Sequence, residues 1–556
     1  MDVAQLRTLL TRPEAYPNLP EPPGRVESLQ THVSLLFFAG DRVYKIRKPV
    51  KFDFLDATTL EKRRHFCEEE VRLNRRLAGE IYHGVVPIVK ASKDRLVVGR
   101  PGMEMAPDEE VIEYAVEMDR LPADRMLSSL LERGKATDSM IDGLADRLAA
   151  FHQKCATGEE VNRYATPEEV RAQVDANLCE SGASLDSLLG IDLISPFRAW
   201  FERTVNELTP LMKARIEEGR VREGHGDLHA GNICVRDAAD EKGEKIVIYD
   251  RIEFTPKFRC RDVAADLAFL TMDLRYRGEA ARAERLIDRY VERSGDDGLR
   301  SLLRLYETHL ALVRGKVALL KSAEAEVPHE ERKEAEQEAL RYVTLAFACM
   351  LGPALILLCG LPATGKSFVS RRLSELLRCP VLRSDEVRKE LAGIEPSEDP
   401  GERREAMYSD EFTARTYGRL RERAEAALDE NRPVIIDATL PTAERRGQLI
   451  GLAQEREIPW VLLHLEASDE TVRRRMTARA RDEEEVSDAN FEVYRQAKQE
   501  FESPEELDPD RVIELAGELD DRQIARSVVH ALNRAAGLIP EDAGAHRQPA
   551  SPLPAS

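Results

Sequence analysis

Residues 353–377, PALILLCGLPATGKSFVSRRLSELL, constrain the fold more than any other segment of the chain. An apolar run leads into a glycine-rich turn, and an amphipathic stretch follows the turn. This order predicts a buried parallel strand, a phosphate-binding loop and then a helix. Glycines allow backbone N–H groups to close around phosphate groups at a helix N-terminus. We expect a triphosphate to lie on this loop, which consists of Gly360, Leu361, Pro362, Ala363, Thr364, Gly365, Lys366 and Ser367.

Two side chains of the loop and one acid further along carry the expected chemistry. The ammonium group of Lys366 would reach the β- and γ-phosphates, and the hydroxyl of Ser367 would bind Mg2+. Asp437 ends the apolar run PVIID (residues 433–437), so it is placed as a second magnesium-binding group at the end of a buried strand.

The same half offers a base and a pair of arginines. Asp385, in RSDEVRKEL (residues 383–391), is expected at a strand end, where it could accept a proton from a substrate hydroxyl, with Arg388 one turn on. Arg475 and Arg479 are four residues apart and share one helical face. Guanidinium groups there would neutralise charge on a transferred phosphoryl group. Ordinary surface charge is the alternative for Asp385 and for both arginines.

A second polar constellation lies in residues 224–250, GHGDLHAGNICVRDAADEKGEKIVIYD. Asp227, His229 and Asn232 share a short loop, and Asp250 follows an apolar run. An acid that accepts a hydroxyl proton, an amide oxygen five residues on and a carboxylate after a strand suit magnesium-assisted phosphoryl transfer. Asp227 would be the base, and Asn232 and Asp250 would hold Mg2+. The alternative is a polar hairpin that joins two strands.

Upstream residues supply partners for this loop. Residues 26–48 alternate between apolar and polar and pause at Gly40, which predicts a hairpin with Lys45 on its second strand. Residues 58–78 predict a helix in which the carboxylate of Glu70 lies among apolar positions and so needs a partner. We expect an ion pair between Lys45, which would hold the nucleotide phosphates, and Glu70. The alternatives are Lys48 or Lys51 for the lysine and Glu69 for the acid.

Three further expectations concern the N-terminal half. Residues 113–118 read as a strand whose backbone would hold adenine. His152 is expected to be a packed or capping residue, and Asp262 to cap a helix or to brace the loop that carries Asp227. No GxGxxG loop precedes Lys45, unlike the pattern of protein kinases.

Composition limits the remaining classes. A chain of 556 residues predicts two or three domains. Its formal net charge of −20 disfavours nucleic acid as a general partner, although a local basic cleft remains open. The eight cysteines form no CxxC pair, which favours a reducing cytosol over a disulfide or zinc framework. Residues 342–365 lack charge, but a helix end followed by a buried strand explains them better than a membrane span.

The residues quoted above resemble those of known families. The loop of Asp227, Asn232 and Asp250 resembles that of aminoglycoside phosphotransferases and related kinase-like enzymes. GLPATGKS, SDEVRK, VIIDAT and the paired arginines, in this order, resemble P-loop kinases of the gluconate kinase, zeta-toxin and polynucleotide 5′-kinase type. Together the chain resembles a bacterial bifunctional family in which an aminoglycoside phosphotransferase-like domain is fused to a P-loop kinase-like ATP-binding domain, loosely named an AAA family ATPase.

The resemblance implies a mixed α/β and α+β chain. A protein-kinase-like bilobal domain would span residues 1–345 and a P-loop domain with a doubly wound parallel sheet residues 350–536. Residues 537–556, rich in Pro, Ala and Ser, would be a disordered tail.

The predicted activity is transfer of the γ-phosphoryl group of ATP, with Mg2+, to a hydroxyl of a small sugar-, polyol- or aminoglycoside-like molecule at one or both nucleotide sites. The alternatives are a nucleic-acid 5′-end kinase that uses the P-loop half, and an ATP-binding regulator with one degenerate site. The expected location is the cytoplasm, without a membrane partner, and the oligomeric state stays open.

Overall fold

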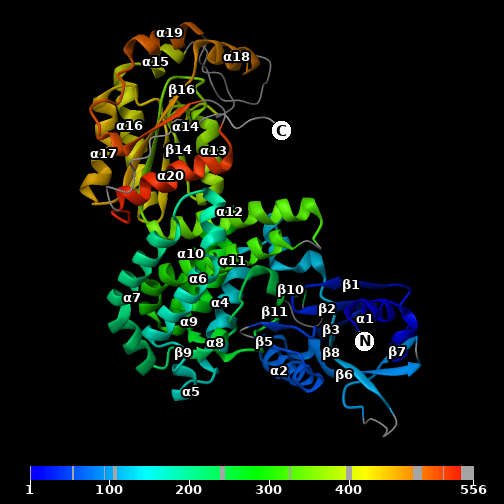
Figure 1. Ribbon diagram of the computed structural model, residues 1–556. Coiled ribbons are helices and arrows are strands. Elements are labelled where there is room, and N and C mark those ends of the chain that lie inside the picture. Colours follow the sequence, from blue (N-terminus) through cyan, green and yellow to red (C-terminus); the bar gives the residue numbers. More distant parts are fainter. Residues whose placement is uncertain are drawn as a thin grey trace. The chain divides into compact units, whose positions relative to one another are not determined.

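The protein is described by a computed structural model that covers residues 2–52, 55–92, 94–103, 109–237, 244–324, 327–395, 403–479, 491–516 and 519–539. The chain forms two compact units, and its path passes from one to the other three times. Unit 1 comprises Met1–Val170 and Leu208–Tyr306, and unit 2 comprises Arg171–Glu207 and Glu307–Ser556. Figure 1 gives the elements of both units in sequence colours, and each unit is described by itself below.

Unit 1 begins with an antiparallel sheet of six strands in the order β1-β2-β3-β8-β6-β7. The predicted hairpin joins β2 to β3, and Gly40 makes its turn with φ of +59°. The strands are β1 (Val26–Gln30), β2 (Ser34–Ala39), β3 (Arg42–Arg47), β6 (Tyr82–Ser92), β7 (Arg95–Val98) and β8 (Val111–Asp119), and a short hairpin pairs β4 (Lys51–Phe52) with β5 (Leu55–Asp56).

One helix packs on each side of this sheet. Helix α2 (Leu60–Ala78) starts where the Thr59 side chain accepts a hydrogen bond from the Lys62 N–H and ends at Gly79. Its buried face meets β6 and β8 through an apolar cluster that includes Cys67, Val71 and Val116. Helix α1 (Val3–Leu10) contributes to a second cluster with β2 and β3. Together they form the small lobe that carries Lys45 and Glu70.

The rest of unit 1 is mostly helical and contains two short antiparallel pairs. The helices are α3 (Leu127–Glu132), α4 (Asp138–Gln153), α5 (Glu159–Asn162), α8 (Pro256–Arg259), α9 (Val263–Tyr276) and α10 (Ala280–Ser294). Strand β10 (Ile233–Asp237) pairs with β11 (Glu244–Ile248), and β9 (Val221–Glu223) pairs with β12 (Cys260–Asp262). Three long helices cross the unit borders: α6 (Pro167–Leu189), α7 (Ile194–Glu217) and α11 (Arg300–Ala323).

Asp262 caps α9, as one of its two predicted roles required. Its carboxylate accepts the Ala264 N–H at 2.8 Å. The same carboxylate forms two 2.7 Å hydrogen bonds with the guanidinium of Arg215, which also binds Asp296. All three charged side chains are buried, so this ion cluster fixes the start of α9.

Unit 2 contains a parallel sheet of five strands in the order β14-β15-β13-β16-β17. Every residue of the central strand β13 (Ala354–Cys359) is buried, as expected for a parallel strand covered on both faces. Helices α16 and α17 cover one face, and α13 and α20 pack on the other (Figure 1). This is a doubly wound arrangement. The remaining strands are β14 (Val381–Arg383), β15 (Pro433–Asp437), β16 (Trp460–Glu466) and β17 (Val512–Ala516).

The helices of unit 2 are α12 (His329–Leu351), α13 (Lys366–Leu377), α14 (Ser384–Leu391), α15 (Arg404–Met407), α16 (Asp410–Leu428), α17 (Ala443–Glu455), α18 (Asp469–Arg479), α19 (Phe491–Glu500) and α20 (Asp521–Ala535). The uncharged segment 342–365 consists of the end of α12, strand β13 and the following loop, as predicted. Among the helices that the structure describes, none combines the length and the apolar character needed to cross a bilayer.

Candidate active sites

In unit 1 the ammonium of Lys45 lies between two carboxylates from distant parts of the chain. Its Nζ is 2.9 Å from Oε1 of Glu70 on α2 and 2.6 Å from Oδ1 of Asp250. Burial opposes the charge on Lys45, but the carboxylates of Asp250 and Glu70 outweigh burial and raise the pKa of Lys45 above its usual value. The predicted ion pair of Lys45 with Glu70 is therefore present.

The competing residues lie elsewhere. The Nζ of Lys48 donates to the Thr31 carbonyl, and Lys51 is exposed on β4. The carboxylate of Glu69 pairs with Arg72 on the same helix. The geometry thus selects Lys45 and Glu70 from the alternatives that the sequence left open.

The β10–β11 hairpin brings Asn232 and Asp250 to one end. Asn232 precedes β10 and Asp250 follows β11, and the Tyr249 N–H donates to the Asn232 carbonyl at 3.0 Å. Asp250 has φ of +61°, an unfavourable conformation for a non-glycine residue, which turns its backbone out of the strand. Lys45 offsets the effect of burial and lowers the pKa of Asp250.

The loop residue Asp227 contacts Asn232 directly. The Asn232 side chain donates to the Asp227 carbonyl at 3.0 Å and to its carboxylate at 3.4 Å. The His229 Nε2 lies 3.6 Å from the same carboxylate. Within the described residues, Oδ1 of Asn232 and Oδ2 of Asp250 take part in no hydrogen bond or ion pair. Two oxygen atoms are thus available to Mg2+, the cation that prefers oxygen ligands.

A buried carboxylate of α9 holds the backbone of this loop. Asp266 accepts the N–H groups of His225 at 2.5 Å and Gly226 at 2.9 Å, and His152 contacts it at 3.1 Å. His152 also bonds the Tyr290 hydroxyl, so it is a packed histidine, as predicted. An ideal Cβ on Gly226 would lie 2.7 Å from the Phe258 carbonyl oxygen, so only glycine fits there. Asp266 was not identified in the sequence analysis. The signal was a single acid within the apolar run VAADLAFL.

We expect Asp266→Asn to destabilise the protein by about 3 kcal/mol at neutral pH, because an anionic acceptor is removed from buried donors. Burial alone would raise the pKa of Asp266, but the hydrogen bond and charge of His152 and the N–H of His225 hold it well below its usual range. The folded pKa is depressed, so the stabilisation is present above the unfolded pKa of about 4 and is lost as the pH falls through the folded value.

Chemical denaturation of the wild type and the variant between pH 7 and pH 3 checks this. The difference in unfolding free energy should narrow toward the acid end. The exposed acid Asp297 provides a control, since Asp297→Asn should change the stability by less than about 0.5 kcal/mol. If the difference in unfolding free energy between the wild type and Asp266→Asn did not change with pH, Asp266 would not be the buried carboxylate anion that we assign.

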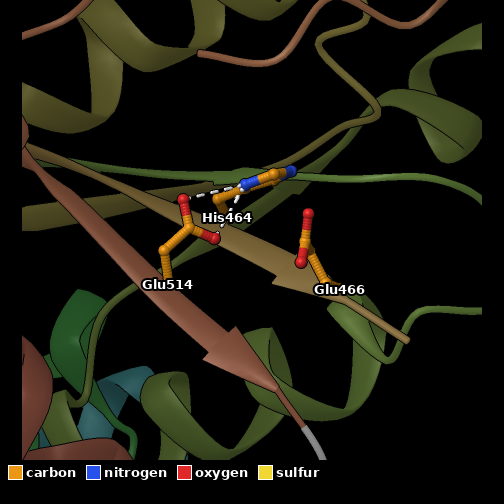
Figure 2. Close-up of side chains that lie close together, drawn as sticks. All are labelled: His464, Glu466 and Glu514. Atoms are coloured by element: carbon orange, nitrogen blue, oxygen red, sulfur yellow. Dashed lines mark hydrogen bonds and ion pairs between the residues drawn. The ribbon is translucent and has the colours of Figure 1, made fainter. Parts of the chain in front are cut away.

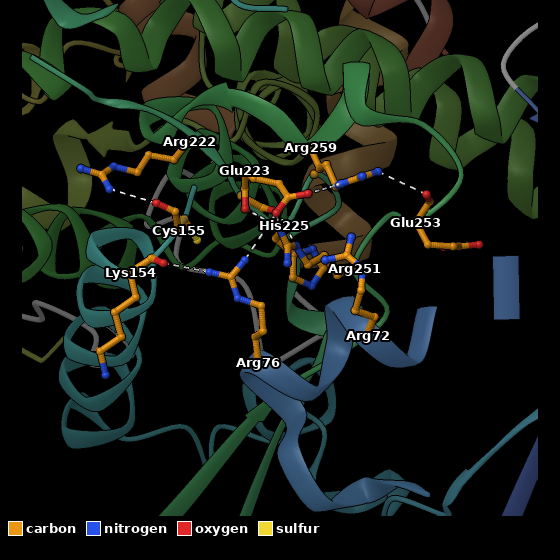
Figure 3. Close-up of polar contacts among 12 residues, drawn as sticks. Arg72, Arg76, Lys154, Cys155, Arg222, Glu223, His225, Arg251, Glu253 and Arg259 are labelled. Atoms are coloured by element: carbon orange, nitrogen blue, oxygen red, sulfur yellow. Dashed lines mark hydrogen bonds and ion pairs between the residues drawn. The ribbon is translucent and has the colours of Figure 1, made fainter. Parts of the chain in front are cut away.

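A cluster of arginines ties the residue after Asp250 to the residues before Asp227 (Figure 3). The Arg251 side chain donates to the carbonyls of Gly224, at 2.5 Å, and Glu223, and its N–H donates to the Asn74 side chain on α2. The Glu223 carboxylate pairs with Arg259 at 3.1 Å and with Arg76 of α2 at 3.4 Å. Burial lowers the pKa of Arg251 to about 10. These contacts link α2, the loop that carries Asp227 and the residue after Asp250.

In unit 2 the loop 360–365 joins β13 to α13, as the sequence predicted. An ideal Cβ on Gly360 would lie 2.5 Å from the Leu465 carbonyl oxygen, so the close approach requires glycine. Gly365 is the N-cap of α13 and supplies no side-chain cap, and its carbonyl accepts the N–H groups of Phe368 and Val369. The loop thus leads into the positive end of the helix dipole, which favours an anion. The Lys366 Nζ donates to the carbonyls of Gly360 and Leu361 at 2.8 Å each. These features fit a bound phosphate group.

Asp437 and Asp385 occupy different settings. Asp437 is buried at the end of β15 and accepts the Ser370 hydroxyl at 3.0 Å. Ser370 lies about one turn of α13 after Ser367, and Asp437 is in register with Leu358 of the strand that enters the loop. Asp385 was expected at a strand end but is an exposed residue in the first turn of α14. Arg388 is buried and donates to Met407 and Thr413.

Arg475 reaches the phosphate-binding loop from α18. Its guanidinium donates to the carbonyls of Thr364 at 2.8 Å and Ala363 at 3.3 Å. The side chain of Arg479 lies outside the described residues. Beside Arg475 is a pocket of about 640 Å³ that includes Leu361 and Thr364 of the loop, the end of β16, and Tyr494 and Lys498 of α19. Sequence reasoning did not single out Tyr494 and Lys498, because neither belongs to a motif recognised in this half.

The strand predicted at residues 113–118 is present, and its role in holding adenine stays a prediction. Residues 113–118 belong to β8, which is paired with β3 on one side and β6 on the other. Residues 115–118 lie between two paired strands, whereas the Tyr114 N–H donates to the Glu113 side chain and the Tyr114 carbonyl accepts the Cys67 thiol. The backbone that follows this strand, after Asp119, is the segment that leaves the sheet.

A family model described as an AAA domain matches residues 355–504. Its span begins in β13 and includes the glycine-rich loop, Asp437 and Arg475. The match, the loop geometry and the constellation around Lys45 define the class: the chain is an enzyme of the kinase type, a nucleotide-dependent phosphotransferase.

Among individual proteins, the chain is similar to "Uncharacterized protein Rv2004c" of Mycobacterium tuberculosis (strain ATCC 25618 / H37Rv), with 29% identity over 471 residues, 84% of this chain and 88% of the relative. "Uncharacterized protein Mb2027c" of Mycobacterium bovis matches with the same figures. The similarity therefore extends through both units.

Two solved structures with similarity to parts of the chain have kinase titles. A choline/ethanolamine kinase family protein from Mesorhizobium loti is 16% identical and covers 62% of this chain and 99% of its own, with a TM-score of 0.36. A gluconokinase from Sinorhizobium meliloti 1021 is 19% identical and covers 33% and 94%, with a TM-score of 0.25.

Proposed function

We propose that the chain is an ATP- and Mg2+-dependent phosphotransferase with two nucleotide sites, of the aminoglycoside phosphotransferase-like and P-loop kinase-like type. It transfers the γ-phosphoryl group to a hydroxyl of a small sugar-, polyol- or aminoglycoside-like molecule. The contact of Lys45 with both Glu70 and Asp250 carries the proposal, because it gathers the nucleotide-binding cation and a metal-binding acid from three distant segments.

In unit 1 each residue has one task. Lys45, held by Glu70, binds the nucleotide phosphates. Asn232 and Asp250 hold Mg2+ through the oxygen atoms left available, and bound Mg2+ supplies positive charge that offsets the charge of the phosphates. Asp227 orients the acceptor hydroxyl and takes its proton. The contacts of Asp266 and Arg251 keep these groups at fixed positions, which favours reaction by orientation.

In unit 2 the loop N–H groups and Lys366 bind the triphosphate, and Ser367 and Asp437 hold its Mg2+. Arg475 already lies at the loop and would turn from the carbonyls of Ala363 and Thr364 to phosphoryl oxygens, with Arg479 as its helical neighbour. Asp385 serves as the acceptor base from the exposed start of α14. Both sites solve the same problem, neutralising phosphoryl charge while aligning an oxygen nucleophile.

The test is ADP release by the purified full-length protein with ATP and a panel of sugars, polyols, aminoglycosides and 5′-hydroxyl oligonucleotides. We expect one class of small hydroxyl compound to stimulate release. Chelation of Mg2+ should abolish it, and added Mg2+ should restore it, because both sites hold the phosphates through a metal.

The panel also separates the alternatives. Stimulation by oligonucleotides alone, weakened by salt, would assign the acceptor to nucleic acid and contradict the small-molecule proposal. ATP binding without turnover for any acceptor would favour a regulator. We further propose a cytoplasmic location, which fits the eight cysteines, all free in the structure.

A further inference from the structure

Beside the phosphate-binding loop of unit 2 lies a second group of metal-ligating side chains that the proposed reaction does not use. It consists of His464 and Glu466 on β16 and Glu514 on β17 (Figure 2). One ligand atom from each residue can be chosen so that all three lie within 4.8 Å of one another. We propose that these three residues bind a divalent transition-metal ion such as Zn2+.

The sheet produces the cluster through its register. His464 and Glu466 are two residues apart on β16, so their side chains leave the same face. Glu514 is the direct partner of His464 in the parallel pairing of β16 with β17. The backbone of both strands thus fixes the three Cβ positions on one face of the sheet.

The histidine is held in one orientation at the wall of a pocket. His464 is 3% exposed, and its Nδ1 lies 2.9 Å from the Glu514 carboxylate. Its ring stacks on Phe501 with centroids 5.6 Å apart and planes inclined by 11°. Within the described residues Nε2 has no hydrogen-bond partner, and His464 lines the 640 Å³ pocket. An ion on Nε2 would lie far from Glu514, which contacts the other nitrogen, so Nδ1 is the nitrogen that can share one ion with Glu514, and the ion would replace this contact.

The carboxylates complete the site. Glu466 is exposed and forms no hydrogen bond or ion pair among the described residues, and it lines the same pocket. Two ligand atoms of a tetrahedral site, each about 2.1 Å from the ion, lie about 3.4 Å apart, so closing the site needs shifts of up to about 1.4 Å. The exposed side chains of Glu466 and Glu514 can make them.

The chemistry of the donor set selects the ion. One imidazole and two carboxylates suit Zn2+, Co2+ or Mn2+, whereas Mg2+ prefers oxygen ligands only. The cationic pocket residues are engaged elsewhere, Lys498 with Asp469 and Arg475 with the loop carbonyls. Three protein ligands leave a coordination position toward the pocket, where an oxygen of a ligand bound next to the loop could enter.

The test is direct metal binding by the full-length protein, prepared without a histidine tag and stripped with chelator. Calorimetry with Zn2+ and the visible absorption of Co2+ are measured in excess Mg2+, which occupies the oxygen-only sites. We expect one ion per chain, and a tenfold or greater loss of affinity in Glu466→Gln and in Glu514→Gln. Both residues are exposed, so these variants should fold normally.

Glu470→Gln is the matched control, because Glu470 is an exposed glutamate on the neighbouring helix α18 and should leave binding unchanged. Absence of stoichiometric binding in the wild type would overturn the proposal and leave an ordinary His464–Glu514 ion pair. Binding of the same strength in both cluster variants would do so as well. The readout does not involve turnover, so its failure is distinct from failure of the proposed reaction.

Discussion

Lys366→Ala is expected to reduce the nucleotides bound per chain from two to one and to lower turnover at unit 2 by about 10²–10³-fold. Lys366 is the only lysine of the loop 360–367, and its Nζ sits on the loop carbonyls where the phosphates would approach. Arg475 does not replace it, because Arg475 is assigned its own contact with the phosphoryl oxygens when it turns from Ala363 and Thr364. Calorimetric stoichiometry with a non-hydrolysable ATP analogue and ADP release together measure the effect.

The matched control is Lys333→Ala, which removes an exposed lysine of α12 in the same unit and should change neither quantity. If Lys366→Ala still bound two nucleotides per chain, Lys366 would not be needed to bind the nucleotide. That result would contradict the role assigned to the loop of unit 2. A stoichiometry of one in the wild type would reduce the protein to a single nucleotide site.

Asp227→Asn is expected to lower kcat at unit 1 by about 10²–10⁴-fold while nucleotide affinity stays within about threefold. Asparagine keeps the size of the side chain, but its amide cannot take the hydroxyl proton. Lys45 and Asp250 do not depend on Asp227 for the contact that joins them. Steady-state kinetics with the best acceptor of the panel, together with nucleotide binding, separate this effect from misfolding.

Asp94→Asn serves as the control, because Asp94 is an exposed acid of unit 1 far from the catalytic loop in sequence. If Asp227→Asn lost nucleotide binding to the same extent as kcat, the residue would act in binding rather than as a base. If kcat stayed unchanged while Lys366→Ala abolished it, turnover with that acceptor would belong to unit 2.

Local sequence patterns predicted several elements of the fold. The β2–β3 hairpin, α2, the β13–loop–α13 segment and the buried ends of strands at Asp437 and Asp250 follow from apolar alternation, glycines and helical periodicity. The contact between Lys45 and Glu70 was also predicted, because a carboxylate on an apolar helix face needs a partner and Lys45 was favoured by the loop of Asp227 that follows. The functional roles of these residues, and the division of the chain at about residue 345–350, stay predictions.

Long-range contacts were beyond the sequence. Nothing local indicates that Asp266 accepts the N–H groups of a loop 40 residues earlier, or that Arg251 donates back to Gly224. Asp385 illustrates the opposite error, since its strand ends two residues earlier than expected and the acid falls in the next helix. Strand registers such as His464 with Glu514 depend on how separate segments pair, which one sequence does not specify.

The threefold passage of the chain between its units has a consequence for synthesis. Residues 171–207 belong to unit 2 but leave the ribosome roughly 100 residues before Glu307 begins the rest of that unit. Until Glu307 and the residues after it are made, the apolar side chains of residues 171–207 lack their final partners. Contacts between segments so far apart in sequence form slowly, so we expect unit 2 to fold slowly and to bind chaperones early. A fragment that begins at the glycine-rich loop would likewise lack residues 171–207. A fragment of unit 2 would therefore need residues 171–207 supplied as a separate chain.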